Sequence, residues 1–235
     1  DLESRLGKAP GGYQYPLYET DVPFIFMNSV GLHRDMVTMV HEGGHAIHSF
    51  LDKELELVEF KSPPSEVAEL ASMSMELLSM EHWDEFFDNP EELKRAKRQQ
   101  LEGVMDTLPW IACIDKFQHW VYLNPGHSVE ERYEAWNKIV KDFGSSVVNY
   151  EGFRDSLNRR WQAQLHLYEV PFYYIEYGFA QLGAIAVWRN YKLNPAEAIQ
   201  QYKKALALGY TRNIPGIYEA AGIRFDFSSA YIKEL

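Results

Sequence analysis

The string His41-Glu42-Gly43-Gly44-His45 restricts this chain more than any other feature of its sequence. Residues four positions apart in an α-helix lie on one face, one turn from each other, so both imidazoles can reach a single ion. Neutral imidazole is a good zinc ligand, and Glu42 projects beside the pair, where it can reach a water bound to the metal. The two glycines cost the helix about 1 kcal/mol each relative to alanine. The spacing therefore predicts a helix that carries part of a zinc site, with another backbone or a substrate close to the glycines.

A catalytic zinc site needs a third protein ligand and an open fourth position. Glu66, Glu69 and Glu76 lie on one stripe of the next predicted helix. A short connection that returns this helix antiparallel to the first would bring a carboxylate beside the imidazoles, and both Glu66 and Glu69 have a suitable spacing. Glu76 is a candidate acceptor for the N–H of a ligand imidazole. A solvated acidic face is the alternative interpretation of the stripe.

Most of the chain has helical periodicity, and one segment near its start does not. Apolar residues on both sides of Glu19-Thr20-Asp21 predict a hairpin or pair of strands at Tyr13 to Tyr18 and Pro23 to Asn28. Helices are predicted at about Arg34 to Leu51, Ser65 to Met80, after Pro90 towards Tyr122 with a kink or break at Pro109, Ser128 to Phe143, Phe153 to His166, Phe172 to Tyr191 and Pro195 to Leu208. We therefore expect a mainly α fold with a small β-hairpin or sheet near the N-terminus.

Composition and charge exclude several classes of protein. Apolar residues make up 46% and charged residues 24% of the 235 residues, which is typical of a globular protein with a sizeable core. The formal net charge of −11 argues against a nucleic-acid partner. The longest apolar stretches are a few residues, so we expect no membrane span. The single Cys113 suits a reducing compartment, and we expect a cytoplasmic protein, although the chain begins at Asp1 without a methionine.

Two motifs together resemble a known family. His41-Glu42-x-x-His45-x-x-His48 followed by Ala68-Glu69-Leu70-Ala71-Ser72-x-x-x-Glu76 is similar to the thimet oligopeptidase and oligoendopeptidase F family of zinc metallopeptidases, in particular to the oligoendopeptidase F branch. The similarity extends to three further segments, which are Gly7 to Tyr13, Pro23 to Asn28, and His166 with Pro171 to Tyr177.

The resemblance implies that Glu69, rather than Glu66, is the third ligand of one zinc ion per chain. We then expect His48 to be packed or to lie behind the ligands. The resemblance also implies a multi-helix, zincin-like fold, with residues 1–235 as one catalytic peptidase domain. Such a domain would be the C-terminal portion of a longer enzyme, whose missing helical N-terminal part would form the other wall of a deep channel and is a possible partner.

The aromatic segment near residue 170 has two interpretations. From the residues alone, Tyr173, Tyr174 and Tyr177 fit a core stripe. The resemblance instead places His166 and Tyr177 at the site, where an imidazole and a phenol could donate to the oxyanion that develops on a peptide carbonyl. Tyr173 and Tyr174 are then candidates for substrate binding.

The function predicted from these features is a zinc-dependent endopeptidase that hydrolyses oligopeptides. Glu42 would accept a proton from the attacking water and pass it to the leaving amine. The strand Phe24 to Asn28 would pair with the extended substrate, which makes Phe26 and Asn28 candidate substrate contacts. Two alternatives stay open. One is an inactive metal-binding or helical interaction module, and the other is a zinc hydrolase of non-peptide amides.

Overall fold

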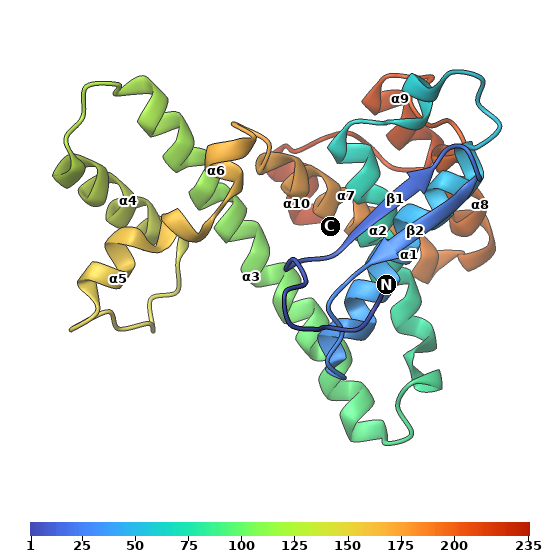
Figure 1. Cartoon of the computed structure of the whole chain (residues 1–235), viewed down its shortest axis with the longest axis horizontal. Coiled ribbons are helices and arrows are strands. Elements are labelled where there is room, and N and C mark those ends of the chain that lie inside the picture. The colour runs from blue at the N-terminus through green and yellow to red at the C-terminus, as the bar shows by residue number, and fades with distance from the viewer. The chain divides into compact units, whose positions relative to one another are not determined.

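The computed structural model describes residues 1–235 and contains helices and one two-stranded antiparallel sheet (Figure 1). The elements are β1 (Tyr13–Leu17), β2 (Val22–Phe26), α1 (His33–Asp52), the 3₁₀ segment η1 (Val58–Lys61), α2 (Ser65–Ser79), the 3₁₀ segment η2 (Met80–Glu85), α3 (Pro90–Leu123), α4 (Val129–Phe143), α5 (Arg154–Arg159), the 3₁₀ segment η3 (Arg160–Ala163), α6 (His166–Glu169), α7 (Ile175–Leu193), α8 (Pro195–Leu206), α9 (Ile214–Ala220) and α10 (Ser229–Glu234). The predicted fold class, mainly α with a small β-hairpin near the N-terminus, is confirmed.

The chain forms two compact units. The first contains Asp1–Arg98 and Phe179–Leu235, and the second contains Gln99–Gly178. The boundaries fall inside α3 and α7. That residues 1–235 form a single catalytic domain stays a prediction. None of the helices combines the length and the hydropathy that crossing a membrane requires.

The hairpin lies alongside α1 (Figure 1). The outer edge of β2 hydrogen-bonds to the first residues of the chain. Residues 1–4 hydrogen-bond to the segment that ends β2 and continues to Ser29, including Met27 N to Asp1 O at 3.0 Å and Ser29 N to Leu2 O at 2.8 Å. Pro16 of β1 lies opposite Pro23 of β2. Neither proline has an N–H, so this is a non-hydrogen-bonded pair and, two residues along, Gln14 directs its backbone polar groups away from β2. The outer edge of β1 therefore carries no partner strand.

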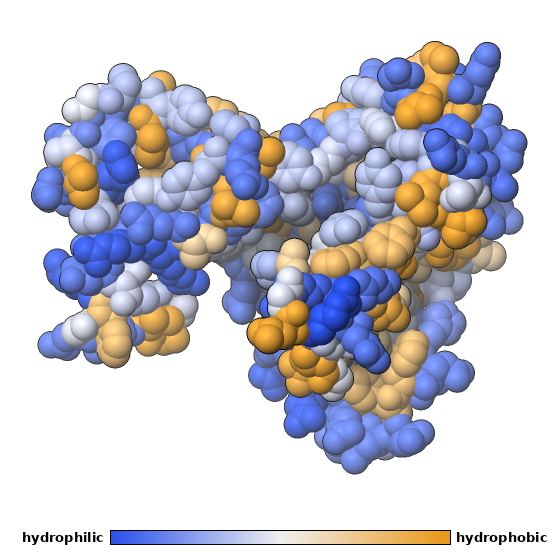
Figure 2. All heavy atoms as spheres, viewed as in Figure 1, coloured by the Kyte–Doolittle hydropathy of each residue, from blue (hydrophilic) through white to orange (hydrophobic).

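The face of the hairpin directed away from α1 is mostly apolar. Figure 2 shows hydrophobic residues at the surface in the region where Figure 1 draws β1 and β2. The exposed members of this face are Tyr13, Tyr15, Leu17, Val22 and Phe24. Tyr13 stacks on Phe26, with ring centroids 4.9 Å apart.

A side chain at its N-terminus fixes the start of α1. One carboxylate oxygen of Asp35 accepts hydrogen bonds from Leu32 N at 2.8 Å and Val30 N at 2.7 Å. The bond from Leu32 satisfies an amide that a helix leaves without a partner, and both bonds hold the pKa of Asp35 below its usual range. The helix runs from His33 to Asp52, which confirms the predicted Arg34 to Leu51 to within one residue at each end.

Gly44 lets α1 and α2 approach very closely. A Cβ atom placed on Gly44 would lie 2.7 Å from Ser72 Cα and 2.9 Å from Ala71 O, whereas one placed on Gly43 would meet nothing within 4 Å. The predicted close approach of another backbone is therefore present at Gly44. Packing does not explain Gly43.

The core of the first unit surrounds α2. Two tyrosine hydroxyls donate to carbonyls of this helix, Tyr202 to Ala71 O at 2.6 Å and Tyr218 to Glu66 O at 3.1 Å. Both rings are buried. In the rest of this core, Val67, Leu70 and Leu78 of α2 pack with residues of α7, α8 and α9. The latter include Ala186, Val187, Ala205, Leu206 and Ile217. These contacts fix α2 in position and rotation against the rest of the unit.

One helix prediction is wrong, and another places the start of its helix too early. The predicted helix Phe153 to His166 is divided into α5 and η3, and His166 instead begins the short helix α6. The predicted start at Phe172 fails because this residue has φ 63°, and its N–H donates to the buried side chain of Gln118 at 2.8 Å. Helix α7 begins at Ile175, three residues later. Pro109 lies inside α3 without dividing it.

The two glycines of the motif predict opposite effects of an added methyl group. Gly44→Ala should lower the free energy of unfolding by about 1–3 kcal/mol, because the methyl group overlaps the α2 backbone. Gly43→Ala is the matched control and should leave stability unchanged or raise it by up to about 1 kcal/mol, since alanine favours helix. Urea unfolding of both metal-free variants measures the difference. Equal effects of the two substitutions would contradict the packing.

Candidate metal centre

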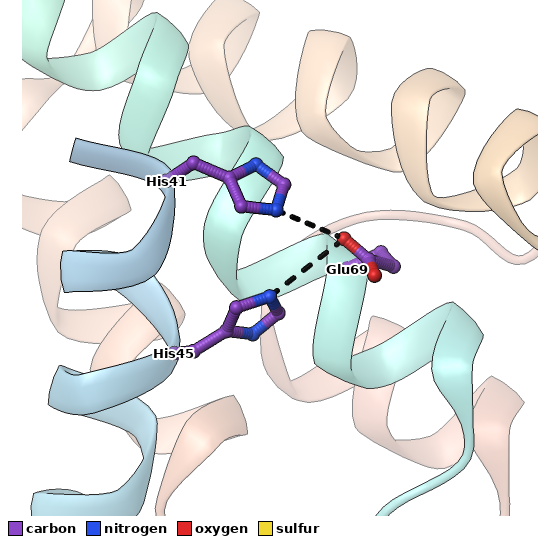
Figure 3. A group of neighbouring side chains, drawn as sticks. All are labelled: His41, His45 and Glu69. Atoms are coloured by element: carbon purple, nitrogen blue, oxygen red, sulfur yellow. Dashed lines mark ion pairs between the residues drawn. The ribbon is translucent and has the colours of Figure 1, made fainter. Parts of the chain in front are cut away.

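The three predicted ligands converge between α1 and α2 (Figure 3). His41 and His45 project from successive turns of α1 toward Glu69 of α2. One carboxylate oxygen of Glu69, Oε2, lies 3.4 Å from His41 Nε2 and 3.8 Å from His45 Nε2. The ligand atoms of all three residues lie within 4.8 Å of one another.

This donor set fits a zinc ion. Two ligands of a tetrahedral zinc, each about 2.0–2.1 Å from it, are separated by roughly 3.4 Å, close to the two distances from Glu69 Oε2. Two imidazoles and one carboxylate leave the fourth position for water or substrate, as in catalytic zinc sites. The residues present therefore suit a catalytic rather than a closed structural zinc.

Glu76 orients one of the imidazoles. His41 Nδ1 lies 2.6 Å from Glu76 Oε1, one turn of α2 beyond Ser72, and this hydrogen bond leaves Nε2 directed at the centre. Burial disfavours the charged form of His41, but the hydrogen bonds to Glu69 and Glu76 outweigh it and raise its pKa to about 10. A metal ion at Nε2 would therefore displace a proton.

The other two ligands are also held by neighbours. Ser72 donates its hydroxyl to Glu69 Oε2 at 3.0 Å, inside the buried interface. Burial raises the pKa of Glu69, but the hydrogen bond with His41 outweighs it, so the carboxyl stays ionised. Burial lowers the pKa of His45 to about 4 and so keeps this imidazole neutral, the form that binds metal.

One carboxylate oxygen of Glu42 accepts no hydrogen bond from the protein. The side chain is buried, its Oε2 has no hydrogen-bond partner, and burial raises its pKa. The backbone N–H of Gln14 donates to the same carboxylate, and a Cβ atom on Gly12 would lie 3.4 Å from Oε1. A buried acceptor of this kind can take a proton from a water at the centre.

Phe26 and Asn28, predicted as substrate contacts, make contacts within the protein. Phe26 stacks on Tyr13 and lies under the ammonium of Lys8, 4.4 Å from the ring centroid. The Asn28 amide donates to Ala9 O at 2.9 Å and to Gly11 O at 3.0 Å. Asn28 thus anchors the loop before β1, and contact of either residue with substrate stays a prediction.

The second unit brings together the predicted oxyanion donors and tyrosines. His166 Nε2 lies 3.4 Å from the Tyr177 hydroxyl, and Gln164 Nε2 lies 2.7 Å from His166 Nδ1. The amide of Gln164 is a donor, so the proton of neutral His166 lies on Nε2. The rings of Tyr173 and Tyr174 pack against His166 with centroids 5.9 and 5.0 Å away. These four residues and the ligand group belong to different units, so their joint action stays a prediction.

Sequence reasoning found Glu76 as the partner of a ligand imidazole but missed two other neighbours of the site, Ser72 and Gln14. Ser72 is part of the motif that follows Ala68, yet spacing gives no sign that its hydroxyl reaches Glu69. Gln14 acts through its backbone, which no side-chain pattern reveals. His48 is buried against Leu206, as expected for a packed histidine, and its Nε2 lies 3.8 Å from the buried Asp52 Oδ2.

Comparison with known proteins identifies the family. A profile of the family described as "Peptidase family M3" matches residues 1–235. "Oligopeptidase PepF" of Bacillus subtilis is 22% identical over 228 residues, which is 95% of this chain and 33% of that protein. "Oligoendopeptidase F, plasmid" of Lactococcus lactis subsp. cremoris is 33% identical over 240 residues, which is 96% of this chain and 37% of that protein. This chain therefore spans about a third of the length of these relatives.

A solved structure has the same fold. "PZ peptidase A with inhibitor 2" superimposes on this chain with a TM-score of 0.88 and 30% identity, covering 100% of this chain and 41% of that one. The similarity extends over both compact units.

Loss of one ligand should remove the metal. The chain should bind about one zinc per molecule, and His45→Ala should reduce this to background, because two remaining protein ligands hold zinc weakly. Metal analysis after dialysis against a weak chelator measures the ratio. The exposed His119→Ala is the matched control and should keep one zinc. Equal zinc in both variants would contradict the assignment.

The burial of Asp52 should make the stability of the protein depend on pH. Burial raises its pKa to about 7, with Lys61 opposing the shift. In the unfolded chain its pKa is about 3.9. Between these two pKa values the folded state binds a proton that the unfolded state has lost, so the free energy of unfolding falls as pH rises towards 7. In metal-free protein, Asp52→Asn should therefore raise Tm more at pH 8 than at pH 5. The same change in Tm at both pH values would contradict the burial of a carboxylate.

Proposed function

Because the chain belongs to peptidase family M3, we propose that it hydrolyses internal peptide bonds of oligopeptides with one zinc ion held by His41, His45 and Glu69. The observation that carries the proposal is the convergence of these three ligand atoms beside a buried carboxylate oxygen of Glu42 that has no partner. The relatives named oligopeptidase and oligoendopeptidase F support the class of substrate.

Glu42 is the proposed general base. Zinc in such a site lowers the pKa of a coordinated water to about 7 and polarises a carbonyl oxygen. Glu42 accepts the proton of the attacking water on Oε2 and then passes it to the amine that leaves. Burial raises the pKa of Glu42, which makes the carboxylate a stronger base than an exposed one.

The outer edge of β1 is the proposed support for the substrate backbone. The edge of β2 that faces away from β1 is occupied by residues 1–4, whereas Gln14 directs its backbone carbonyl away from β2 without a partner strand. An extended peptide could pair along this edge, next to Glu42. Backbone pairing would favour many sequences equally, as suits an oligopeptidase.

His166 and Tyr177 are the proposed donors to the oxyanion. With Gln164 donating to His166 Nδ1, the Nε2–H of His166 and the hydroxyl of Tyr177 are two donors 3.4 Å apart, close enough to point to one oxyanion. A donor aimed at developing charge contributes a few kcal/mol to catalysis. Tyr173 and Tyr174 pack against His166 and would hold the donors in place.

Substitution of the base tests this function. Glu42→Gln should keep about one zinc and lower kcat for a quenched fluorescent peptide by about 10²–10⁴-fold, because no group accepts the proton of water. The exposed Glu59→Gln is the matched control and should keep both zinc and activity. A peptide acetylated at one end and amidated at the other tests internal cleavage, since exopeptidases need a chain end.

Two outcomes would contradict the proposal. One is zinc binding by the chain without any cleavage of blocked peptides. The other is near-normal turnover by Glu42→Gln, which would remove Glu42 from the mechanism.

A further inference from the structure

A cavity in the first unit opens beside one of the proposed zinc ligands. Its volume is ≈ 380 Å³, within the range of ligand-binding pockets. One wall comes from β1 and the residue after it, another from the last turns of α1, and a third from the segment between η1 and α2. Its lining includes Gln14, His45, His48, Asp52 and Lys61.

Two buried side chains at this cavity face each other as hydrogen-bond acceptors. His48 Nε2 lies 3.8 Å from Asp52 Oδ2, and the two residues are 4% and 3% exposed. His48 donates its other ring N–H to the carbonyl of Leu206, so Nε2 carries the lone pair, and it has no hydrogen-bond partner. His48 therefore offers no N–H to Asp52, whose carboxylate accepts the backbone N–H of its own residue.

No cation forms an ion pair with Asp52, although the positive charge of Lys61 partly offsets the effect of burial on its pKa. His48 is the one ionisable side chain within ion-pair distance of it, and burial keeps His48 neutral. The ammonium of Lys61, in the cavity wall, donates to the carbonyl of Lys53 at 2.6 Å. A buried carboxylate without an ion-pair partner is costly, and groups of this kind are found at functional sites more often than elsewhere.

The cavity also lies along the proposed path of the substrate. Gln14, on the outer edge of β1, lines it together with His45. Side chains of an extended peptide point alternately to opposite faces, so a peptide on this edge would direct one side chain toward the cavity. The net charge of −11 favours the approach of cationic peptides.

We propose that this cavity is a subsite for a basic side chain of the substrate, lysine or arginine, and that Asp52 selects it. The ammonium or guanidinium supplies the N–H donors and the positive charge that Asp52 and His48 lack. The subsite rests on the proposed function for its place in catalysis, but binding of the side chain needs only the cavity. Asp52 contacts the side chain and none of the reacting atoms, so it affects the choice of substrate rather than the chemical step.

Matched peptides test the selection. Three blocked fluorogenic peptides carry lysine, norleucine or glutamate at one position, which is moved along the sequence on both sides of the cleaved bond. At one position the lysine peptide should have a kcat/KM at least tenfold above the norleucine peptide. Asp52→Asn should abolish this ratio by lowering kcat/KM for the lysine peptide to that of the norleucine peptide. The exposed neighbour Glu54→Gln is the matched control and should keep the ratio.

Binding without turnover separates this proposal from the catalytic one. Titration calorimetry of the metal-free chain with acetyl-Ala-Lys-Ala-amide and its norleucine analogue should show at least tenfold tighter binding of the lysine peptide, lost in Asp52→Asn. A chain that binds in this way but cleaves nothing keeps the subsite and contradicts the peptidase. Equal binding of both peptides would overturn the subsite. In the cleavage assay, a preference for the glutamate peptide would also overturn the subsite and would point to Lys61.

Discussion

The close contact of two antiparallel helices is the constraint on which the site depends. Gly44 has no side chain, so α1 lies against the α2 backbone at Ser72, and this contact fixes which turn of α2 faces the histidines. Glu69 then lies beside His41 and His45, and Glu76 lies one turn further, at the other nitrogen of His41. A ligand geometry of this kind cannot adapt by loop movement, because every ligand stands on a packed helix.

The rest of the first unit keeps α2 in its rotation. Tyr202 and Tyr218 donate to carbonyls on either side of Glu69, and their buried rings leave α2 little freedom to turn. On the other helix, β1 supplies the backbone N–H of Gln14 to Glu42. The hairpin, the motif helix and the core therefore act on the same few side chains. Asp52, at the C-terminal end of α1, is a buried carboxyl group. Its burial costs stability, and a cost of this kind fits a role in binding.

The sequence allowed the helix of the motif, the hairpin and the ligand pair to be predicted, because their periodicity is local. Spacing could not choose between Glu66 and Glu69, which stand three residues apart on one stripe. In the structure, the contact at Gly44 decides which of the two faces the histidines. From the sequence, only the family resemblance indicated Glu69. The break before His166 and the late start of α7 depend on side chains far along the chain, such as Gln118 bonding to Phe172, and no local pattern encodes them. The cavity at Asp52 joins three separate segments and was missed for the same reason.

X-ray absorption spectroscopy at the zinc edge of the loaded chain tests the central claim most directly. The account predicts a first shell of nitrogen and oxygen atoms at about 2.0–2.1 Å, with the outer-shell scattering of two imidazoles. Glu69→Gln should change the oxygen contribution and leave the two imidazoles in place. A first shell with sulfur, or with no imidazole scattering, would contradict a zinc ion held between these two helices.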